Sequence, residues 1–294
     1  MTWENELIES DLVDKNIDKT PKSDVIFKIL FGNPKHPRLL LRMLNAIIEN
    51  PQPITAVEIK QTELTPEFVG QRGVRLDVLA KTLDGQLINV EIQKNNEHNM
   101  VPRSLFHCAK IFSGQAVISE KYEDLKRTVC INIMNFKLFD DSRYWHKNWV
   151  TDSETHEKLT DLLELHFLEI PKIKKLQPNS ELLFWLEFIN DPFSDKIKGM
   201  YELEEVYAEA KSAYEKAIAD PKVREMLRVR EKAEMDYKDA MVRNYDKGEK
   251  AGIEKGAHNA KIETARNLLK VGVDINVIAT AVGLSIEEIE KICK

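Results

Sequence analysis

The sequence predicts an α/β fold, with a compact core followed by a helical C-terminal region. Apolar residues recur at helical spacing over residues 23–48, and a break that contains Gly and Pro divides this run into two helices. Short stretches rich in Val, Ile and Leu follow over residues 57–92 and are typical of β-strands. A helical segment at about 102–117 and an apolar strand at 128–134 come next. This order predicts a core that ends near residue 140.

Composition divides the chain into four regions. Residues 1–20 are polar and lack periodicity, which predicts a loose N-terminal arm. Residues 21–140 form the predicted core. Residues 141–199 mix aromatic and charged side chains, and we expect helices packed against the core there. Residues 200–294 are highly charged and have a helical pattern, which predicts a charged helical region.

The end of the chain, residues 265–294, contains three short amphipathic segments separated by glycines. This arrangement resembles a helix-turn-helix, a module that places its second helix in a DNA groove. Ser285 and Glu288 have the spacing of a capping box, which predicts the start of the last helix. Small helical tails also serve as packing or oligomer caps. A DNA contact and a homo-oligomer formed through the C-terminal helices are therefore both open at this point.

Several features of the sequence bear on where the protein resides. No uninterrupted apolar run approaches the roughly 18 residues that a membrane span needs, so we expect no membrane contact. The N-terminus is acidic and lacks the basic and then apolar pattern of a secretory signal. Cys108, Cys130 and Cys293 are too widely spaced for a disulfide framework or a zinc site. The sequence therefore predicts a cytoplasmic protein with buried thiols.

The net charge of −6 by itself argues against a nucleic-acid-binding protein, because neutralising phosphates requires clustered Lys and Arg. The charge is unevenly distributed. Residues 22–137 carry 16 basic and 12 acidic residues, a net charge of +4, and the rest of the chain carries −10. A mildly basic module on an acidic chain fits a DNA-binding core, and an ordinary solvated surface fits equally well.

The hairpin predicted around Asp84-Gly85 carries two carboxylates, Asp77 and Glu91. A two-residue turn would direct them to opposite faces. A three-residue loop, Leu83-Asp84-Gly85, with Gly at the left-handed position, places Asp77 directly across from Glu91. The same register gathers the apolar side chains on the other face, where they can be buried: Leu76, Val78, Ala80, Ile88, Val90 and Ile92. Burial of this face therefore selects the three-residue loop.

The predicted register brings two acidic groups to one point. Directly opposed residues of a hairpin have Cβ atoms about 4.5–5.5 Å apart. Carboxylates at this separation repel each other unless a cation or a proton lies between them. Oxygen ligands suit Mg²⁺ or Mn²⁺, which are held by one or two carboxylates and completed by water and substrate phosphate. The geometry alone also fits a solvated acidic pair on the face of a strand.

The order of these residues matches a known nuclease pattern. Asp77 and, after thirteen intervening residues, Glu91 in the segment Val90-Glu91-Ile92-Gln93 before a helix resemble the PD-(D/E)XK nuclease core. More narrowly, the chain resembles the bacterial recombination-promoting nucleases, a transposase family of that superfamily. Further matching positions are the opening helix 24–32, Arg103, Gln115, Tyr122 and the segment 268–289. The resemblance implies a restriction-endonuclease-like core, in which helices flank a mixed central sheet.

Carried over to this sequence, the resemblance implies that Asp77 and Glu91 are metal ligands. Gln93 takes the place of the lysine that is usual in the superfamily. Glutamine can orient a phosphate or water by hydrogen bonds, but it carries no positive charge. Arg103 is a candidate for that charge, and a surface arginine is its simpler interpretation. Asp24 is a candidate for the acidic residue of the first motif, and a plain helix N-cap, a position that Ser23 also suits, explains it equally well.

Two neighbouring residues are not assigned to the site. Lys94 is expected on the opposite strand face, and His107 is interpreted as structural. The implied function is a DNA endonuclease, dependent on Mg²⁺ or Mn²⁺, in DNA recombination or mobile-element biology. A carboxylate-held cation polarises the phosphate and activates water for in-line attack. The alternative is a catalytically inactive DNA-binding or oligomeric accessory protein on the same fold, which the negative net charge and Gln93 favour.

Overall fold

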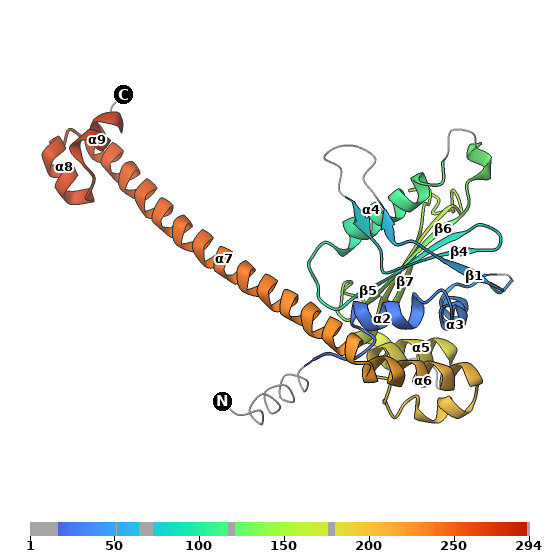
Figure 1. Cartoon of the computed structure of the whole chain (residues 1–294). Coiled ribbons are helices and arrows are strands. Elements are labelled where there is room, and N and C mark those ends of the chain that lie inside the picture. Colours follow the sequence, from blue (N-terminus) through green and yellow to red (C-terminus); the bar gives the residue numbers. More distant parts are fainter. Residues whose placement is uncertain (1–16, 51, 65–72, 117–120, 176–179, 293–294) are drawn as a thin grey trace, which may run out of the picture. The chain divides into compact units, whose positions relative to one another are not determined.

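A six-stranded mixed sheet lies at the centre of the first of two compact units, Met1–Val229 (Figure 1). The computed structural model describes residues 17–50, 52–64, 73–116, 121–175 and 180–292. The strand order is β1-β4-β5-β6-β8-β7. The strands are β1 (Val57–Lys60), β4 (Val78–Thr82), β5 (Leu87–Gln93), β6 (Thr128–Met134), β7 (Trp145–Trp149) and β8 (Leu163–Glu169). The three central strands β5, β6 and β8 run parallel, and the remaining pairs are antiparallel. The predicted α/β fold with a mixed sheet is confirmed.

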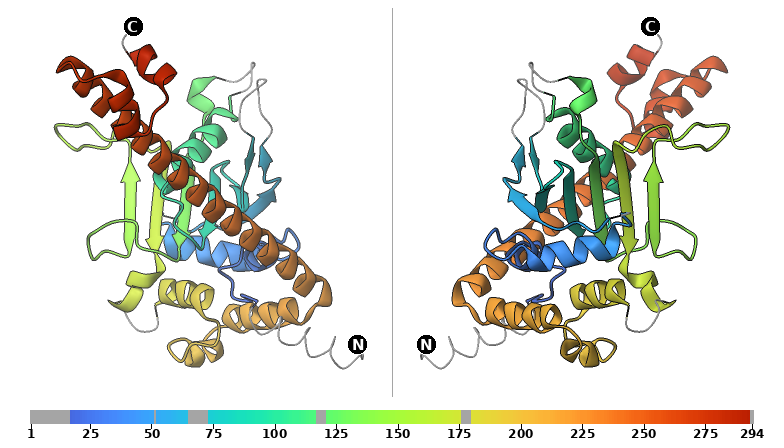
Figure 2. Two further views of the ribbon diagram at one scale, coloured as in Figure 1. Left: turned by 90° about the vertical axis from the view of Figure 1, so that its left-hand side faces the viewer. Right: turned by 90° about the vertical axis from the view of Figure 1, so that its right-hand side faces the viewer.

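Helices cover both faces of this sheet (Figures 1 and 2). On one face lies α4 (Met100–Ser113). On the other lie α2 (Asp24–Phe31) and α3 (Arg38–Ile47), against which α5 (Glu181–Asn190) and α6 (Glu205–Ala219) pack. Every residue of β6 is buried, because both of its faces are covered. The remaining elements of this part are β2 (Glu63–Leu64), β3 (Val74–Arg75), η1 (Tyr122–Asp124), η2 (Ile170–Lys175) and η3 (Lys198–Glu202).

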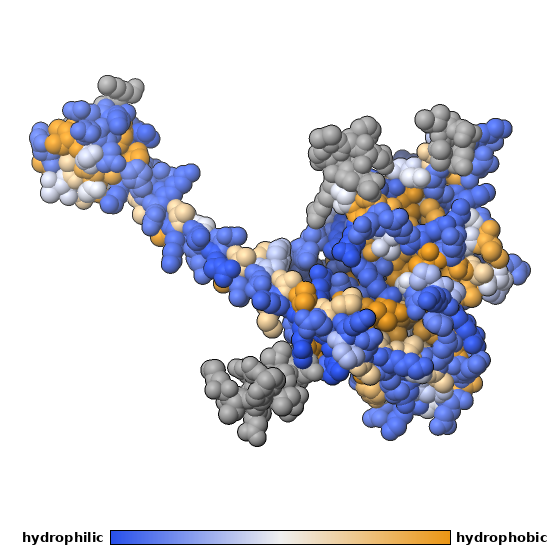
Figure 3. Space-filling view, in the orientation of Figure 1, coloured by the Kyte–Doolittle hydropathy of each residue, from blue (hydrophilic) through white to orange (hydrophobic). Residues whose placement is uncertain are grey.

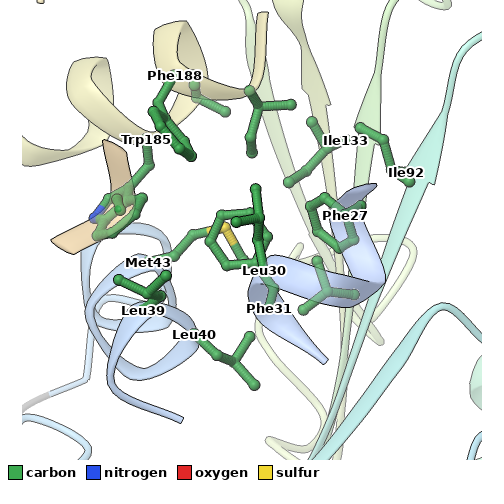
Figure 4. Packing of buried hydrophobic residues seen from close by; sticks show 14 of the residues in the cluster. Phe27, Leu30, Phe31, Leu39, Leu40, Met43, Ile92, Ile133, Trp185 and Phe188 are labelled. Atoms are coloured by element: carbon green, nitrogen blue, oxygen red, sulfur yellow. The ribbon is translucent and has the colours of Figure 1, made fainter. Parts of the chain in front are cut away.

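The largest of the three apolar clusters of the described residues fills the space between the sheet and α2, α3, α5 and α6 (Figure 4). Phe27 and Phe31 from α2 meet Trp185 and Phe188 from α5, with Ile92 of the sheet beside them. Phe31 and Trp185 make an edge contact with ring centroids 6.0 Å apart. These rings fix α2 against both the sheet and α5. The backbone of α2 is therefore held in place for those of its side chains that point away from the core.

The β4–β5 hairpin has the predicted register. Val78 pairs with Val90, and Ala80 pairs with Ile88, as the three-residue loop requires. Gly85 has a φ of 90°, the left-handed conformation expected after Asp84. One residue of the predicted apolar face is placed wrongly. The chain bends at Asp77, so Leu76 packs with the cluster beneath α4, and the expected long strand is divided into β3 and β4.

The prediction of helices over residues 141–199 is wrong for β7 and β8, and the sheet continues past residue 140. The sequence of β8, Leu-Glu-Leu-His-Phe-Leu-Glu, alternates charged and apolar residues and lacks the apolar character of a central strand. Its charges are neutralised by partners. Glu164 accepts from Arg127 and lies 2.6 Å from His166 Nε2. The Arg127 partner lies far away in the sequence, so the local pattern carries no sign of it.

Two predicted regional boundaries also differ from the structure. Helix α6 belongs to the core rather than to a separate charged region, because Tyr207, Ala210 and Tyr214 are buried in the largest apolar cluster. In the predicted N-terminal arm, residues 1–16 lie outside the described residues. Ile17 is buried in the core, and Asp18 pairs with Lys94 at 2.8 Å, so this end of the arm is anchored.

The chain divides into two compact units, Met1–Val229 and Arg230–Lys294. The second contains most of α7 (Pro221–Lys270), together with α8 (Ile275–Val282) and α9 (Ile286–Ile292). The capping box is confirmed, because Ser285 N donates to Glu288 Oε2 at 2.8 Å and Glu288 N donates to Ser285 Oγ at 3.2 Å. The surface of α7 is mainly hydrophilic (Figure 3). Within the described part of the chain, no helix combines the length and apolar character of a membrane span.

Candidate active site

The β4–β5 hairpin places Asp77 and Glu91 side by side, as the register predicts. Asp77 lies at the bend immediately before β4, and Glu91 is on the neighbouring strand β5. The backbone N–H of Ile92 donates to Asp77 Oδ2 at 3.0 Å, and the N–H of Asp77 approaches Glu91 Oε1 at 3.4 Å. The hairpin backbone therefore holds both carboxylates in fixed orientations.

Glu91 is 2% exposed and lies among polar groups from β5 and α4. Asn89 donates to its Oε1 at 3.1 Å, and His107 Nδ1 lies 3.5 Å from the same oxygen. Arg103 Nη2 is 3.8 Å from Oε2, too far for a hydrogen bond. Oε2 is buried and accepts no hydrogen bond from any described residue. A buried carboxylate oxygen without a donor is costly, so this atom has capacity for a further positive group.

Asp77 is 9% exposed and forms an ion pair with a lysine from α2. Lys28 Nζ lies 3.0 Å from Asp77 Oδ1. Burial and the neighbouring Glu91 carboxylate raise the pKa of Asp77 to about 6, against the opposing effect of Lys28. The Asp77 carboxyl group is therefore harder to ionise here than in water.

The other residues assigned from the sequence lie at different distances from the carboxylates. Arg103 Nη1 donates to Gln93 Oε1 at 3.3 Å, so α4 and β5 bring Arg103 and Gln93 together beside Glu91. Ser23 occupies the N-cap position of α2 and Asp24 is the first helical residue, so the N-cap interpretation of Asp24 is wrong. Asp24 lies one helical turn before Lys28, and its role in the site stays a prediction.

Three residues near the carboxylates are not predicted as site residues from the sequence: Lys28, Asn89 and His107. Asn89 shares a strand face with Glu91, and two-residue spacing is a signal that can identify it. Lys28 lies four residues after Asp24 in the matching opening helix, but no local pattern connects it with Asp77. His107 lies four residues after Arg103 on α4, which places both on one helix face.

The donor set fits a hard divalent cation. Two carboxylates lie together, one of them with an oxygen that accepts no hydrogen bond from the described residues. No cluster of three or more His, Cys, Asp or Glu residues suited to a metal is present among the described residues. Mg²⁺ needs no such cluster, since one or two carboxylates, water and substrate phosphate complete its coordination. Asp77 and Glu91 are therefore the residues that would hold it.

A groove of about 430 Å³ opens beside Asp77. Its lining comes from α2, β1 and the segments that follow them: Lys28, Gly32, Pro34, Ile59, Lys60, Gln61, Thr62, Glu63 and Asp77. Two lysines and two carboxylates, Glu63 and Asp77, line it, so the groove carries mixed charge. Lys28 and Lys60 are the groove residues that can meet a phosphate beside the candidate ligand Asp77.

Replacing Asp77 with asparagine is expected to stabilise the metal-free protein by about 2 kcal/mol at neutral pH. The folded-state pKa of about 6 lies above the ordinary aspartate pKa of 3.8, so the folded state binds the proton more tightly than the unfolded state does. The stability of the wild type consequently falls as the pH rises from 3.8 to 6, and the Asp77→Asn variant lacks this loss. Chemical denaturation between these pH values measures the difference.

The exposed Asp140 provides the matched control, since Asp140→Asn removes a carboxylate that is in contact with solvent. Added Mg²⁺ is expected to stabilise the wild type and to have little effect on Asp77→Asn. Equal stability of wild type and Asp77→Asn throughout this pH range would show that the Asp77 carboxylate is not destabilised in the fold.

Comparison with known proteins agrees with this geometry. The model of one family, described as PD-(D/E)XK nuclease family transposase, matches residues 21–244. Neither the search of curated proteins nor that of solved structures finds a match to the chain. The family match covers most of the chain, including the sheet, both carboxylates and the helices that surround them. The chain therefore belongs to the PD-(D/E)XK nuclease family transposases.

Proposed function

We propose that this protein is a metal-dependent DNA endonuclease that uses Mg²⁺ or Mn²⁺. The observation that carries the proposal is the pair of buried carboxylates on the β4–β5 hairpin, with one Glu91 oxygen that no described residue satisfies. Family membership supports phosphodiester hydrolysis as the reaction and DNA as the substrate. The same membership supports a role in DNA recombination or mobile-element biology. The free, buried thiols of Cys108 and Cys130 fit the predicted cytoplasmic location.

The reaction consumes one water molecule. Its oxygen forms a bond to phosphorus as the bond from phosphorus to the leaving sugar oxygen breaks. One water proton ends on the leaving oxygen, and the other remains on the new phosphate group. When bound, the cation supplies polarisation of the phosphate and a more acidic water.

The residues of this chain have distinct parts in that reaction. Asp77 and Glu91 hold the cation, and the hairpin backbone and Asn89 keep their oxygens in place. Gln93 can orient the phosphate or the attacking water by hydrogen bonds, while accepting from Arg103. Arg103 contributes positive charge on the Glu91 side of the site. Asp24 remains a candidate for the acidic residue of the first motif.

Plasmid cleavage tests this proposal. Purified protein is incubated with supercoiled plasmid, either with Mg²⁺ or with EDTA, beside an Asp77→Ala/Glu91→Ala double variant whose folding is checked. We expect nicked or linear DNA only when the metal and both carboxylates are present. A second double variant, Asp140→Asn/Glu97→Gln, removes two exposed carboxylates and should retain the activity. Cleavage that persists in the Asp77→Ala/Glu91→Ala variant would come from another site or a contaminant.

The second candidate function is a DNA-binding or accessory protein without catalysis. Gln93 favours it, because this side chain supplies no positive charge where the superfamily has lysine. The net charge of −6 is a weaker argument for a non-catalytic protein than Gln93 is, since Lys28 and Lys60 line the groove beside Asp77. DNA binding by the wild type without cleavage under Mg²⁺ or Mn²⁺ would establish this alternative.

A homo-oligomer formed through the C-terminal helices is also part of the proposal. In the second unit, α7 exposes large apolar side chains, which include Met235, Tyr237, Met241, Val242, Tyr245 and Ile253. Tyr237, Met241 and Tyr245 follow at four-residue spacing and share one helix face. Such a stripe is typical of a surface that pairs with another helix.

We expect the full-length wild type to form an oligomer that Met241→Glu/Tyr245→Glu converts to a monomer, as measured by light scattering after size exclusion. Lys250→Glu is the control, because nine residues turn a helix by half a revolution from Met241. Point substitutions are used because a truncation at residue 200 would also delete helix α6, which is buried in the core. A monomeric wild type would contradict assembly through α7.

A further inference from the structure

The site lacks a positively charged side chain at the position where the superfamily motif has a lysine. Gln93 follows Glu91 by two residues on β5, so it shares that face of the strand but brings no charge. Two positive side chains from outside the hairpin approach the carboxylates instead. Lys28 lies 3.0 Å from Asp77, and Arg103 lies 3.8 Å from Glu91.

We propose that Lys28, delivered from α2, is the catalytic lysine of this site and contacts the scissile phosphate in the groove beside Asp77. The inference deepens the proposed endonuclease function and rests on it. Its starting observation is that one side chain both touches a candidate metal ligand and lines the groove. A group in that place lies where a phosphate held by the cation would approach.

The position of Lys28 is built into the fold. Its neighbours Phe27 and Leu30 are buried in the core, so α2 cannot rotate to withdraw the lysine. Gly32 ends the helix immediately afterwards, with its N–H donating to the Lys28 carbonyl at 2.8 Å. A Cβ at residue 32 would lie only 2.7 Å from that carbonyl oxygen, so glycine suits this helix end. The backbone that carries Lys28 is thereby fixed on both sides.

The lysine side chain itself retains freedom. It is 31% exposed, and its ammonium group can therefore exchange Asp77 Oδ1 for a phosphate oxygen over a short distance. Its partner Asp77 is buried, so the ion pair also stabilises the charged carboxylate, while the exposed side of the lysine stays open to a second anion. Once a cation is held by Asp77, it competes with the lysine for the same carboxylate, and a phosphate beside them gives the ammonium group another anion to contact. DNA supplies that phosphate.

Arg103 is less suited to the same task. Its guanidinium donates to Gln93 and faces Glu91 from α4, on the other side of the carboxylate pair from α2. Of the described residues that line the groove, Lys28 and Lys60 carry positive charge. Lys28 is the one of these two that contacts Asp77. Lys28 is thus positively charged, lines the groove and contacts a candidate metal ligand.

The test compares Lys28→Gln with a variant that returns the lysine to the motif position, Lys28→Gln/Gln93→Lys. We expect Lys28→Gln to cleave DNA about 100-fold more slowly than wild type in single-turnover reactions. Adding Gln93→Lys to this variant should raise its cleavage rate at least about ten-fold, because β5 then supplies the positive charge. Lys81→Gln removes an exposed lysine from β4 and should leave the rate unchanged.

Mn²⁺ binding, measured by electron paramagnetic resonance without DNA, provides the second readout. Lys28→Gln should bind Mn²⁺ as tightly as the wild type or more tightly, since a positive group beside Asp77 is removed. Loss of Mn²⁺ binding would show that Lys28 acts by positioning Asp77 and would overturn its contact with phosphate. So would wild-type cleavage rates in Lys28→Gln. A wild type that does not cleave would instead refute the endonuclease function itself, together with this inference.

Discussion

The Glu91→Gln variant is expected to cleave DNA at least about 1,000-fold more slowly than the wild type. Substituting a residue that only supports a metal ligand already lowers metal affinity or activity about 10–100-fold. Glu91 is proposed as a ligand itself, so a larger loss is expected. Glutamine has the same shape, so Asn89 and the Asp77 N–H keep an oxygen to donate to. The negative charge that attracts the cation is lost, while the packing is not. Single-turnover cleavage of a labelled duplex under saturating enzyme measures the change.

The exposed Glu97 lies in the loop after β5 and provides the control. Glu97→Gln makes the same chemical change a short distance along the chain and should leave the rate within about two-fold of wild type. Raising the Mg²⁺ concentration should recover part of the activity of Glu91→Gln if weakened binding is the cause. A Glu91→Gln protein with wild-type activity would exclude Glu91 from the metal site.

The second large effect is expected on stability. Trp185→Ala should lower the free energy of unfolding by about 3–5 kcal/mol, because it leaves a large cavity in the main apolar cluster. Trp185 is fully buried and touches Phe31 of α2, Phe188 of α5 and Tyr207 of α6. Its loss removes ring contacts that join α5 to α2 and α6. Urea denaturation followed by circular dichroism measures the difference.

Trp149 provides a matched substitution at the end of β7, where the side chain is 36% exposed. Trp149→Ala should cost less than about 1 kcal/mol, since water replaces much of the lost contact. Equal losses in the two variants would mean that the packing of α2, α5 and α6 around Trp185 does not stabilise the fold. The position of Lys28 on α2 would then lack the support described above.

The sequence predicts the hairpin well because its determinants are local. Asp84 before Gly85 specifies a loop with a left-handed residue, and alternating apolar residues specify the buried face. Together they determine that Asp77 faces Glu91, and the observed pairing of Val78 with Val90 confirms this register. Leu76 is misplaced because the bend at Asp77 interrupts the alternation, and a bend leaves no sign in a pattern of apolar and polar residues.

Features that depend on distant partners could not be predicted in the same way. β8 is a buried strand because Arg127, which lies immediately before β6, neutralises Glu164. Lys28 and His107 reach the carboxylates from helices whose packing is set by the whole core. The charged sequence of α6 conceals one buried face, which consists of Val206, Tyr207, Ala210, Tyr214 and Ala217. In each case the deciding contact joins residues that are far apart in the chain.

Direct measurement of Mn²⁺ binding tests the central claim that Asp77 and Glu91 hold the catalytic cation. Titration of wild-type protein with Mn²⁺, followed by electron paramagnetic resonance, should reveal saturable binding that Mg²⁺ displaces. The folded Asp77→Ala/Glu91→Ala variant should lose this binding, and Asp140→Asn/Glu97→Gln should keep it. Equal binding by the wild type and the Asp77→Ala/Glu91→Ala variant would contradict the account, because the cation would then lie elsewhere on the chain.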